Sequence, residues 1–194
     1  TKLVTEGSVL ELLGGDHRFH TRIYRTGPVG RDGTLDGDLV LVASGDPDLS
    51  ARIHGDTMVF ENEDHSYGVS PDPRAVPGDP LVVIRELAHQ VRQHGITAVR
   101  GHVLVDARLF PEGERELGTG VVISPIVVND NVVDVTVGPG ASPGAATTVQ
   151  VSPVTSYVRF IDRATTGAPD SRPDIEWASD STTPDGSHVV TIAG

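Results

Sequence analysis

The only side-chain primary amine in this sequence belongs to Lys2. Of the 15 basic residues 14 are Arg, and a guanidinium stays protonated at any working pH, so an amine that acts as base or nucleophile has to be Lys2. Cysteine is absent, which removes thiol nucleophiles, thiolate metal ligands and disulfides. A solvated lysine at a helix end is the ordinary interpretation of such a residue, so the surrounding sequence has to decide its role.

Histidines and carboxylates offer two weaker candidate sites. His17 and His20 are three residues apart on a predicted strand, so they point to opposite faces, and no third or fourth metal ligand is evident. A hard cation could be held by one cluster of residues: Glu61, Glu63, Asp64 and His65. Its spacing lacks the pattern of a calcium loop, and charged runs of this kind are usually solvated. The sequence therefore predicts no metal site.

The charge balance argues against nucleic acid as a partner. The net charge is -12, from 27 acidic and 15 basic residues, and the basic residues form no stripe that would overcome repulsion from a phosphate backbone. No apolar run approaches the 18 or so residues of a membrane-spanning helix. The 194 residues could bury one sizeable core or two small ones, and two units are favoured. A mature or trimmed chain fits best.

The centre of the predicted fold consists of two apolar segments and the helix between them. The segment at 37–50 carries five apolar residues before a Gly-Asp-Pro stop, and the segment at 101–110 repeats the form, so both read as buried strands. Between them, residues 79–95 carry apolar side chains at helical spacing. Two strands joined through a helix make a parallel crossover unit, which is nearly always right-handed. The predicted centre is α/β.

The N-terminal residues predict a helix over 1–13 that ends at Gly14-Gly15. The pattern is already under way at Thr1 without a capping residue, so we expect the chain to begin within an element. Residues 17–26 are rich in strand formers and are followed by a turn region before the strand at Gly37, which predicts a hairpin.

The rest of the sequence predicts a change from α/β to β structure. Residues 51–80 lack periodicity and predict a surface connection, whereas 121–128 and 132–137 predict two strands around a turn. From Gly138 the composition shifts to Gly, Pro, Ala and Thr, with alternating segments typical of strands at 148–151, 157–161, 175–178 and 188–192. The predicted fold class is thus α/β plus β. The predicted limits are 1–20 for the first element, 21–137 for the α/β part and 138–194 for the β-rich part.

Read in order, short segments of the chain resemble a known enzyme family. They are Thr1-Lys2-Leu3-Val4-Thr5, Leu12-Leu13-Gly14 with Asp16-His17-Arg18-Phe19, Gly37-Asp38-Leu39, Gly45-Asp46-Pro47, Gly95-Ile96 and Gly101 through Asp106. This order resembles the class C low-molecular-mass penicillin-binding proteins. These are serine D-Ala-D-Ala carboxypeptidases and endopeptidases with large insertions between their first and second catalytic motifs.

The resemblance gives Lys2 a role. In the family a Ser-x-x-Lys motif places a nucleophilic serine one helical turn before a lysine that shares its proton, and Lys2 aligns with that lysine. The matching serine would lie three residues before Lys2, ahead of Thr1, and neither a Ser-x-Asn nor a Lys-Thr-Gly triplet occurs in the sequence. The resemblance implies the end of the first catalytic helix, a remnant of the transpeptidase-like catalytic domain at 1–20, followed by an α/β and a β-rich inserted domain. The fragment by itself is expected to be inactive.

The resemblance also implies a function for the full-length protein. It would remove terminal D-Ala from peptidoglycan stem peptides and be acylated by β-lactams, without a metal or organic cofactor. The protein would be exported, periplasmic or extracellular and associated with the cell wall, and peripheral membrane association is allowed. Family members often place aromatic residues before the strand at Val121, where this chain offers Glu112, Glu114 and Glu116, so no substrate-binding residue is assigned. The alternative is a non-catalytic module that binds cell wall or a protein partner.

Overall fold

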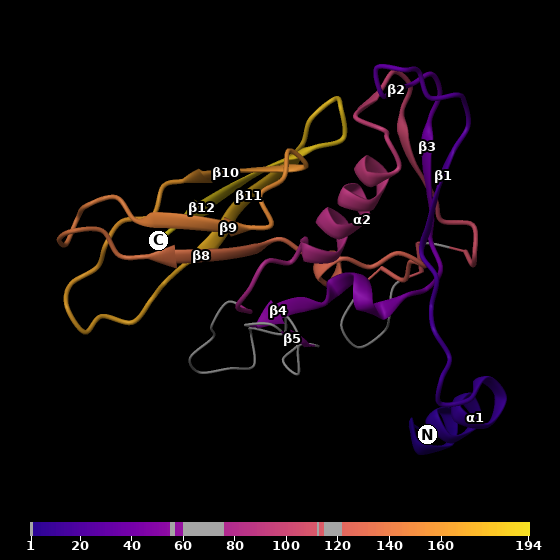
Figure 1. Cartoon of the computed structure of the whole chain (residues 1–194). Coiled ribbons are helices and arrows are strands. Elements are labelled where there is room, and N and C mark those ends of the chain that lie inside the picture. The colour runs from indigo at the N-terminus through magenta and orange to yellow at the C-terminus, as the bar shows by residue number, and fades with distance from the viewer. Residues whose placement is uncertain (1, 55–56, 60–75, 112, 115–121) are drawn as a thin grey trace. The chain divides into compact units, whose positions relative to one another are not determined.

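A computed structural model describes residues 2–54, 57–59, 76–111, 113–114 and 122–194. By its contacts the chain divides into two compact units, each built from two separate stretches of sequence. We call them the α/β unit, residues 1–50 and 82–128, and the β-rich unit, residues 51–81 and 129–194. Figure 1 shows the whole chain with its elements labelled.

The α/β unit is organised around one three-stranded sheet, in the order β1-β3-β7. Its helices are α1 (Lys2–Leu13), the 3-10 helix η1 (Pro47–Ser50) and α2 (Val82–Gln93), and its strands are β1 (Arg22–Arg25), β2 (Thr34–Leu35), β3 (Leu39–Val42), β6 (Ala98–Val99) and β7 (Val103–Asp106). Strand β3 pairs with β1 antiparallel and with β7 parallel. The predicted hairpin and the predicted strand–helix–strand crossover are therefore both confirmed (Figure 1).

The core of this unit lies at the beginning of β3 rather than under β7. Leu35, Leu39 and Ile96 are buried together, and Val91 of α2 and Ile23 of β1 pack against them. The prediction that the segment at 101–110 is a buried strand is wrong in its burial, since Val103 is 71% exposed. Among the described strands β7 pairs only with β3 and is an edge strand of this sheet, and no residue of β7 belongs to the core cluster.

The β-rich unit contains a three-stranded sheet in the order β10-β12-β11 and two hairpins, β8-β9 and β4-β5. Its elements are β4 (Arg52–His54), β5 (Thr57–Val59), the 3-10 helix η3 (Asn129–Asn131), β8 (Asp134–Gly138), β9 (Thr148–Ser152), β10 (Val158–Asp162), β11 (Glu176–Thr182) and β12 (His188–Ala193). Strand β12 is central, parallel to β10 and antiparallel to β11. The four strands predicted after residue 148 are confirmed, each within two residues at its ends, except that β11 continues to Thr182.

Two predictions for the middle of the chain are wrong. Residues 122–128 form no strand beyond a single bridge at Val122, because Pro125 interrupts the Val-rich run and has no N–H to donate. The stretch 51–80 is not only a surface connection, since its described part includes the buried residues Ala51, Arg52 and Val76. The remainder of that stretch, 60–75, lies outside the described residues.

A buried polar network explains why Arg52 is inside. Its guanidinium, 1% exposed, donates to the carbonyl of Gly78 at 2.9 Å and to the side chain of Asn129. Asn129 in turn donates through Nδ2 to Asp134 Oδ2 at 3.0 Å. A buried charge is tolerated only when it is paired and hydrogen-bonded; here the guanidinium is hydrogen-bonded, and Asn129 links it to the carboxylate of Asp134. It joins the two stretches of sequence from which the β-rich unit is built.

The domain limits drawn from composition stay a prediction. The division by contacts runs differently, because β8 pairs with β9 across the run at 138–144 and the stretch 51–81 belongs with the later strands.

Candidate active-site helix

Lys2 is the first residue of α1, the helix predicted over 1–13. Its side chain is exposed, and no hydrogen bond or ion pair joins it to another residue that the structure describes. Side chains three positions apart on a helix stand on the same face. A residue three positions before Lys2 on a continued helix would therefore be its neighbour, as the Ser-x-x-Lys motif requires.

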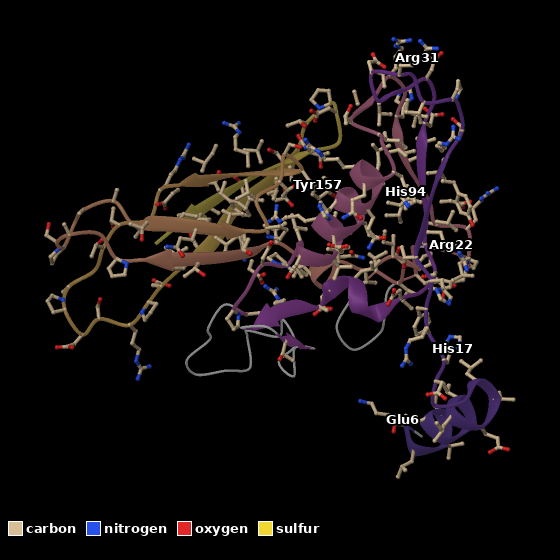
Figure 2. All side chains as sticks on the ribbon, in the orientation of Figure 1. Glu6, His17, Arg22, Arg31, His94 and Tyr157 are labelled. Atoms are coloured by element: carbon tan, nitrogen blue, oxygen red, sulfur yellow. The ribbon has the colours of Figure 1, made fainter. Side chains whose placement is uncertain are left out.

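The apolar residues of α1 are distributed around the whole helix. They include Leu3, Val4, Val9, Leu10, Leu12 and Leu13, and every residue from Lys2 to Leu13 is exposed. Leu3 and Leu12 are 85% and 81% exposed, and Figure 2 shows side chains projecting from this helix, the labelled Glu6 among them. A helix that is apolar all round is typical of the interior of a larger protein rather than of a surface.

The end of α1 is fixed by its own backbone. Gly14 has a φ of +81°, and its N–H donates to the carbonyl of Leu10 at 3.0 Å. This single bond from the residue after the helix to the third residue from its end is the left-handed cap that glycine favours. Helix α1 is thus a defined element with a defined end, although none of its side chains is buried.

Among the described residues, the histidine candidates bring no set of metal ligands together. His17 contacts Phe19 edge-on at a ring-centroid distance of 5.2 Å, and no group of three or more His, Asp or Glu side chains among the described residues could hold a metal ion. The predicted cluster Glu61, Glu63, Asp64 and His65 lies outside the described residues, as do Glu112 and Glu116.

Polar side chains gather at the strand ends of the α/β unit, where the sequence pattern is only weakly informative. At the end of β3, Thr21 Oγ1 lies 2.9 Å from Ser44 Oγ and donates to Asp46 Oδ2 at 3.2 Å. At the end of β7, Arg108 donates to Asp106 from Nε at 2.7 Å and from Nη2 at 2.6 Å. These hydrogen bonds from Arg108 lower the pKa of Asp106 to about 2. Each group is satisfied by a nearby side chain, which favours a structural role for both clusters.

A second carboxylate with a lowered pKa belongs to a turn of the β-rich unit. Hydrogen bonds from the side chain of Thr183, then from Ser187, bring the pKa of Asp185 to about 2. The N–H of Ser187 also donates to Asp185 at 3.1 Å, closing the turn between β11 and β12. This carboxylate holds its own loop in place and lacks the features of a catalytic acid or base.

Comparisons with known proteins point to one family. A family model, that of the D-Ala-D-Ala carboxypeptidase 3 (S13) family, matches residues 1–182. A curated relative, the D-alanyl-D-alanine carboxypeptidase of Actinomadura sp. (strain R39), is 28% identical over 182 residues, which cover 86% of this chain and 28% of the relative.

Solved structures show the same fold at lower identity. Penicillin binding protein 4 from Haemophilus influenzae matches with a TM-score of 0.60 and 16% identity, over 99% of this chain and 37% of that protein. The same protein complexed with a novel β-lactam matches with a TM-score of 0.54 and 16% identity, over 99% of this chain and 34% of that one. The chain thus spans about a third of the length of the relatives that it matches.

None of the described helices is long and apolar enough to cross a membrane. The match of the family model over nearly the entire sequence identifies this chain as a member of the D-Ala-D-Ala carboxypeptidase 3 (S13) family.

Proposed function

We propose that the complete protein is a serine D-Ala-D-Ala carboxypeptidase that acts on peptidoglycan stem peptides and is acylated by β-lactams. The observation that carries this proposal is the family match over residues 1–182, which includes Lys2 and all of α1. The chain supplies the lysine of the first catalytic motif, while the serine and the two later motifs are contributed by other parts of the complete protein.

The chemistry assigned to Lys2 is that of a general base and proton shuttle. The serine hydroxyl attacks the carbonyl carbon of the penultimate D-Ala, and its proton passes to the amine of Lys2. The peptide bond breaks, the proton is relayed to the departing amino group of the terminal D-Ala, and an ester remains on the serine. Water then hydrolyses the ester. An amine accepts a proton only in its neutral form, and burial favours the neutral form.

The apolar surface of α1 supports this assignment. Its leucines and valines point to all sides and contact no core that the structure describes, so the helix is suited to an interior position in which an amine would be desolvated. We extend the proposal to the fold: residues 1–20 belong to the catalytic domain, and the rest of the chain is the insertion between the first and second motifs.

The site of action follows from the substrate. An enzyme that trims stem peptides works on the cell wall, so the complete protein is exported and acts in the periplasm or outside the cell. Peripheral membrane association, which the family resemblance allows, stays a prediction.

Acylation by a labelled penicillin tests the proposal. The complete protein should gain the mass of one penicillin in intact-mass spectrometry, and the 194-residue chain, which lacks a serine in register with Lys2, should gain none. A complete protein that stays unmodified would favour the non-catalytic wall-binding or partner-binding module. A stoichiometric adduct on the 194-residue chain would show that the nucleophile has been misplaced.

A further inference from the structure

A hollow of about 360 Å³ in the β-rich unit is lined by aromatic, aliphatic and polar side chains. Its lining includes Asn131, Thr155, Tyr157, Phe160, Trp177 and His188. We call it the aromatic hollow. Ligand sites commonly start at about 300 Å³ and combine apolar walls with a few polar groups, so the hollow has the size and composition of a small binding site.

The register of the sheet brings Phe160, Trp177 and His188 to one face. Residues paired across neighbouring strands share a face, so the pairs Phe160 with Val190 and Trp177 with Ile192 lie on the same side as His188. A β-bulge follows Trp177, after which Asp180 pairs with Val190. In a regular strand Trp177 and Asp180 would point to opposite faces of the sheet, because successive side chains alternate. The extra residue of the bulge shifts this alternation by one, so that both side chains lie on the same face.

The aromatic rings of the hollow are accessible. Trp177 is 66% exposed and Tyr157 is 59% exposed, and Figure 2 labels Tyr157 just before β10. Each is held by a second ring: Phe160 lies 6.1 Å from Trp177, and His188 lies 5.2 Å from Tyr157, between ring centroids. Spacings of this size are typical of favourable aromatic pairs. The rings are therefore positioned before any ligand arrives.

The polar groups around the rings are ordered by hydrogen bonds. Thr155 Oγ1 accepts a hydrogen bond from the N–H of Tyr157 at 3.1 Å, and His188 Nδ1 lies 2.9 Å from Asp180 Oδ1. A carboxylate oxygen can only accept, so His188 Nδ1 carries the proton of this hydrogen bond. No Lys, Arg, Asp or Glu belongs to the lining within the described part of the chain.

We propose that the aromatic hollow binds one pyranose ring of a neutral, N-acetylated glycan. The face of an aromatic ring carries partial negative charge, which attracts the C–H groups on the apolar face of a sugar, while hydroxyl and amide groups at the sugar's edge meet the polar side chains. A lining without Lys or Arg gives a phosphate or carboxylate ligand no permanent counter-charge, so an uncharged ligand is favoured. The choice of a cell-wall glycan rests on the proposed function; sugar binding itself does not.

Trp177 allows a direct measurement, since it is the only tryptophan of the chain. Titration of the 194-residue chain with the trimer of N-acetylglucosamine should change the tryptophan fluorescence saturably, with a dissociation constant on the order of 1 mM or tighter. Tyr157→Ala should weaken binding by about tenfold because one stacking face is lost. Tyr157→Phe keeps the ring and should bind within about twofold of wild type.

A matched control is available in the other unit. Tyr24→Ala removes an exposed tyrosine of β1 and should leave the titration unchanged. The proposal is overturned if the trimer gives no saturable change up to about 10 mM, or if Tyr157→Ala binds as wild type does. It is also overturned if a sugar-free peptide ending in D-Ala-D-Ala gives the same change, which would make the hollow a peptide site. Penicillin acylation of the complete protein is measured separately, so either proposal can fail without the other.

Discussion

The two α-helices of this chain have the same length, 12 residues each, and opposite surroundings. Helix α2 gathers its apolar residues on one side, and Val91 packs there against Leu39 and Ile96. Helix α1 spreads its apolar residues around its circumference and buries none of them. An amphipathic helix needs one partner surface, whereas a helix that is apolar all round needs to be enclosed.

The two helices therefore differ in role: α2 packs on the core of the α/β unit, and α1 carries the candidate catalytic residue. Around α2, the pairing of β3 with β7 and the core cluster are formed by residues that the structure describes. Helix α1 carries the candidate catalytic residue Lys2 and packs none of its side chains into the core cluster that the structure describes. This contrast supports the proposal that α1 belongs to a catalytic core of the complete protein and α2 to an inserted domain.

The largest expected effect comes from exchanging the cation on α1. In the complete protein Lys2→Arg should slow acylation by a fluorescent penicillin at least about a hundredfold, or about 2.7 kcal/mol, because a guanidinium cannot give up its proton. The reverse exchange on the other helix, Arg92→Lys, should leave the rate unchanged. Acylation by folded Lys2→Arg within about tenfold of wild type, as checked by circular dichroism, would show that Lys2 is not the base.

The glycines that end the two helices should respond differently to alanine. Gly95 follows α2 at φ +83° and closes a Schellman motif, in which Ile96 N–H donates to Val91 and Gly95 N–H donates to Arg92. Gly95→Ala should lower the free energy of unfolding of the 194-residue chain by about 1–2 kcal/mol, since a Cβ disfavours this φ. Gly14→Ala should only fray α1. Equal losses in urea unfolding would mean that α1 is part of the same cooperative unit.

A matched pair of valines tests the packing of the two helices. Val91→Ala removes two methyl groups that contact the core cluster and should cost about 1 kcal/mol. Val9→Ala, on the exposed surface of α1, should stay within about 0.5 kcal/mol of wild type. Urea unfolding of the 194-residue chain measures both. A loss for Val9→Ala as large as that for Val91→Ala would show that α1 packs in this chain after all.

The smallest effect concerns a cation that has a partner. Arg108 holds the pKa of Asp106 at about 2, whereas Lys2 has no ion pair within the described residues. Because folding lowers the pKa of Asp106, its pairing with Arg108 stabilises the fold above pH 3.8, the ordinary carboxyl pKa. This stabilisation is lost as the pH falls from 3.8 toward 2. Arg108→Ala should move the Asp106 titration up toward 3.8 in carbon NMR. An unchanged midpoint would assign the shift to the backbone of the loop.

Local periodicity was enough to predict much of the fold. The crossover around α2 and the last four strands follow from apolar spacing and turn residues, and both are present. What the sequence could not show is which residues meet over long separations. Arg52 looks like a surface residue until Asn129, which lies 77 positions away, is seen to accept from its guanidinium. The exposure of β7 likewise depends on strand order, which no local pattern contains.

The candidate sites also differ in whether local sequence can reveal them. Lys2 was found through a motif, because its spacing from a serine is local, and its catalytic role stays a prediction. The aromatic hollow was missed, since Tyr157, Phe160 and Trp177 sit in alternating segments that look like ordinary strands. A single-residue bulge decides which face Trp177 and Asp180 share, and the sequence gives no sign of it.

The interleaving of the two units has a consequence for biosynthesis. The chain starts the α/β unit, leaves it after residue 50, returns at residue 82 and leaves again after residue 128. A ribosome therefore cannot release a finished first unit before residue 128 has emerged. Arg52 cannot form its hydrogen bond with Asn129 until Asn129 has been synthesised 77 residues later. Until then the stretch 51–81 is synthesised but cannot be enclosed, which exposes it to chaperones and proteases at that stage of translation.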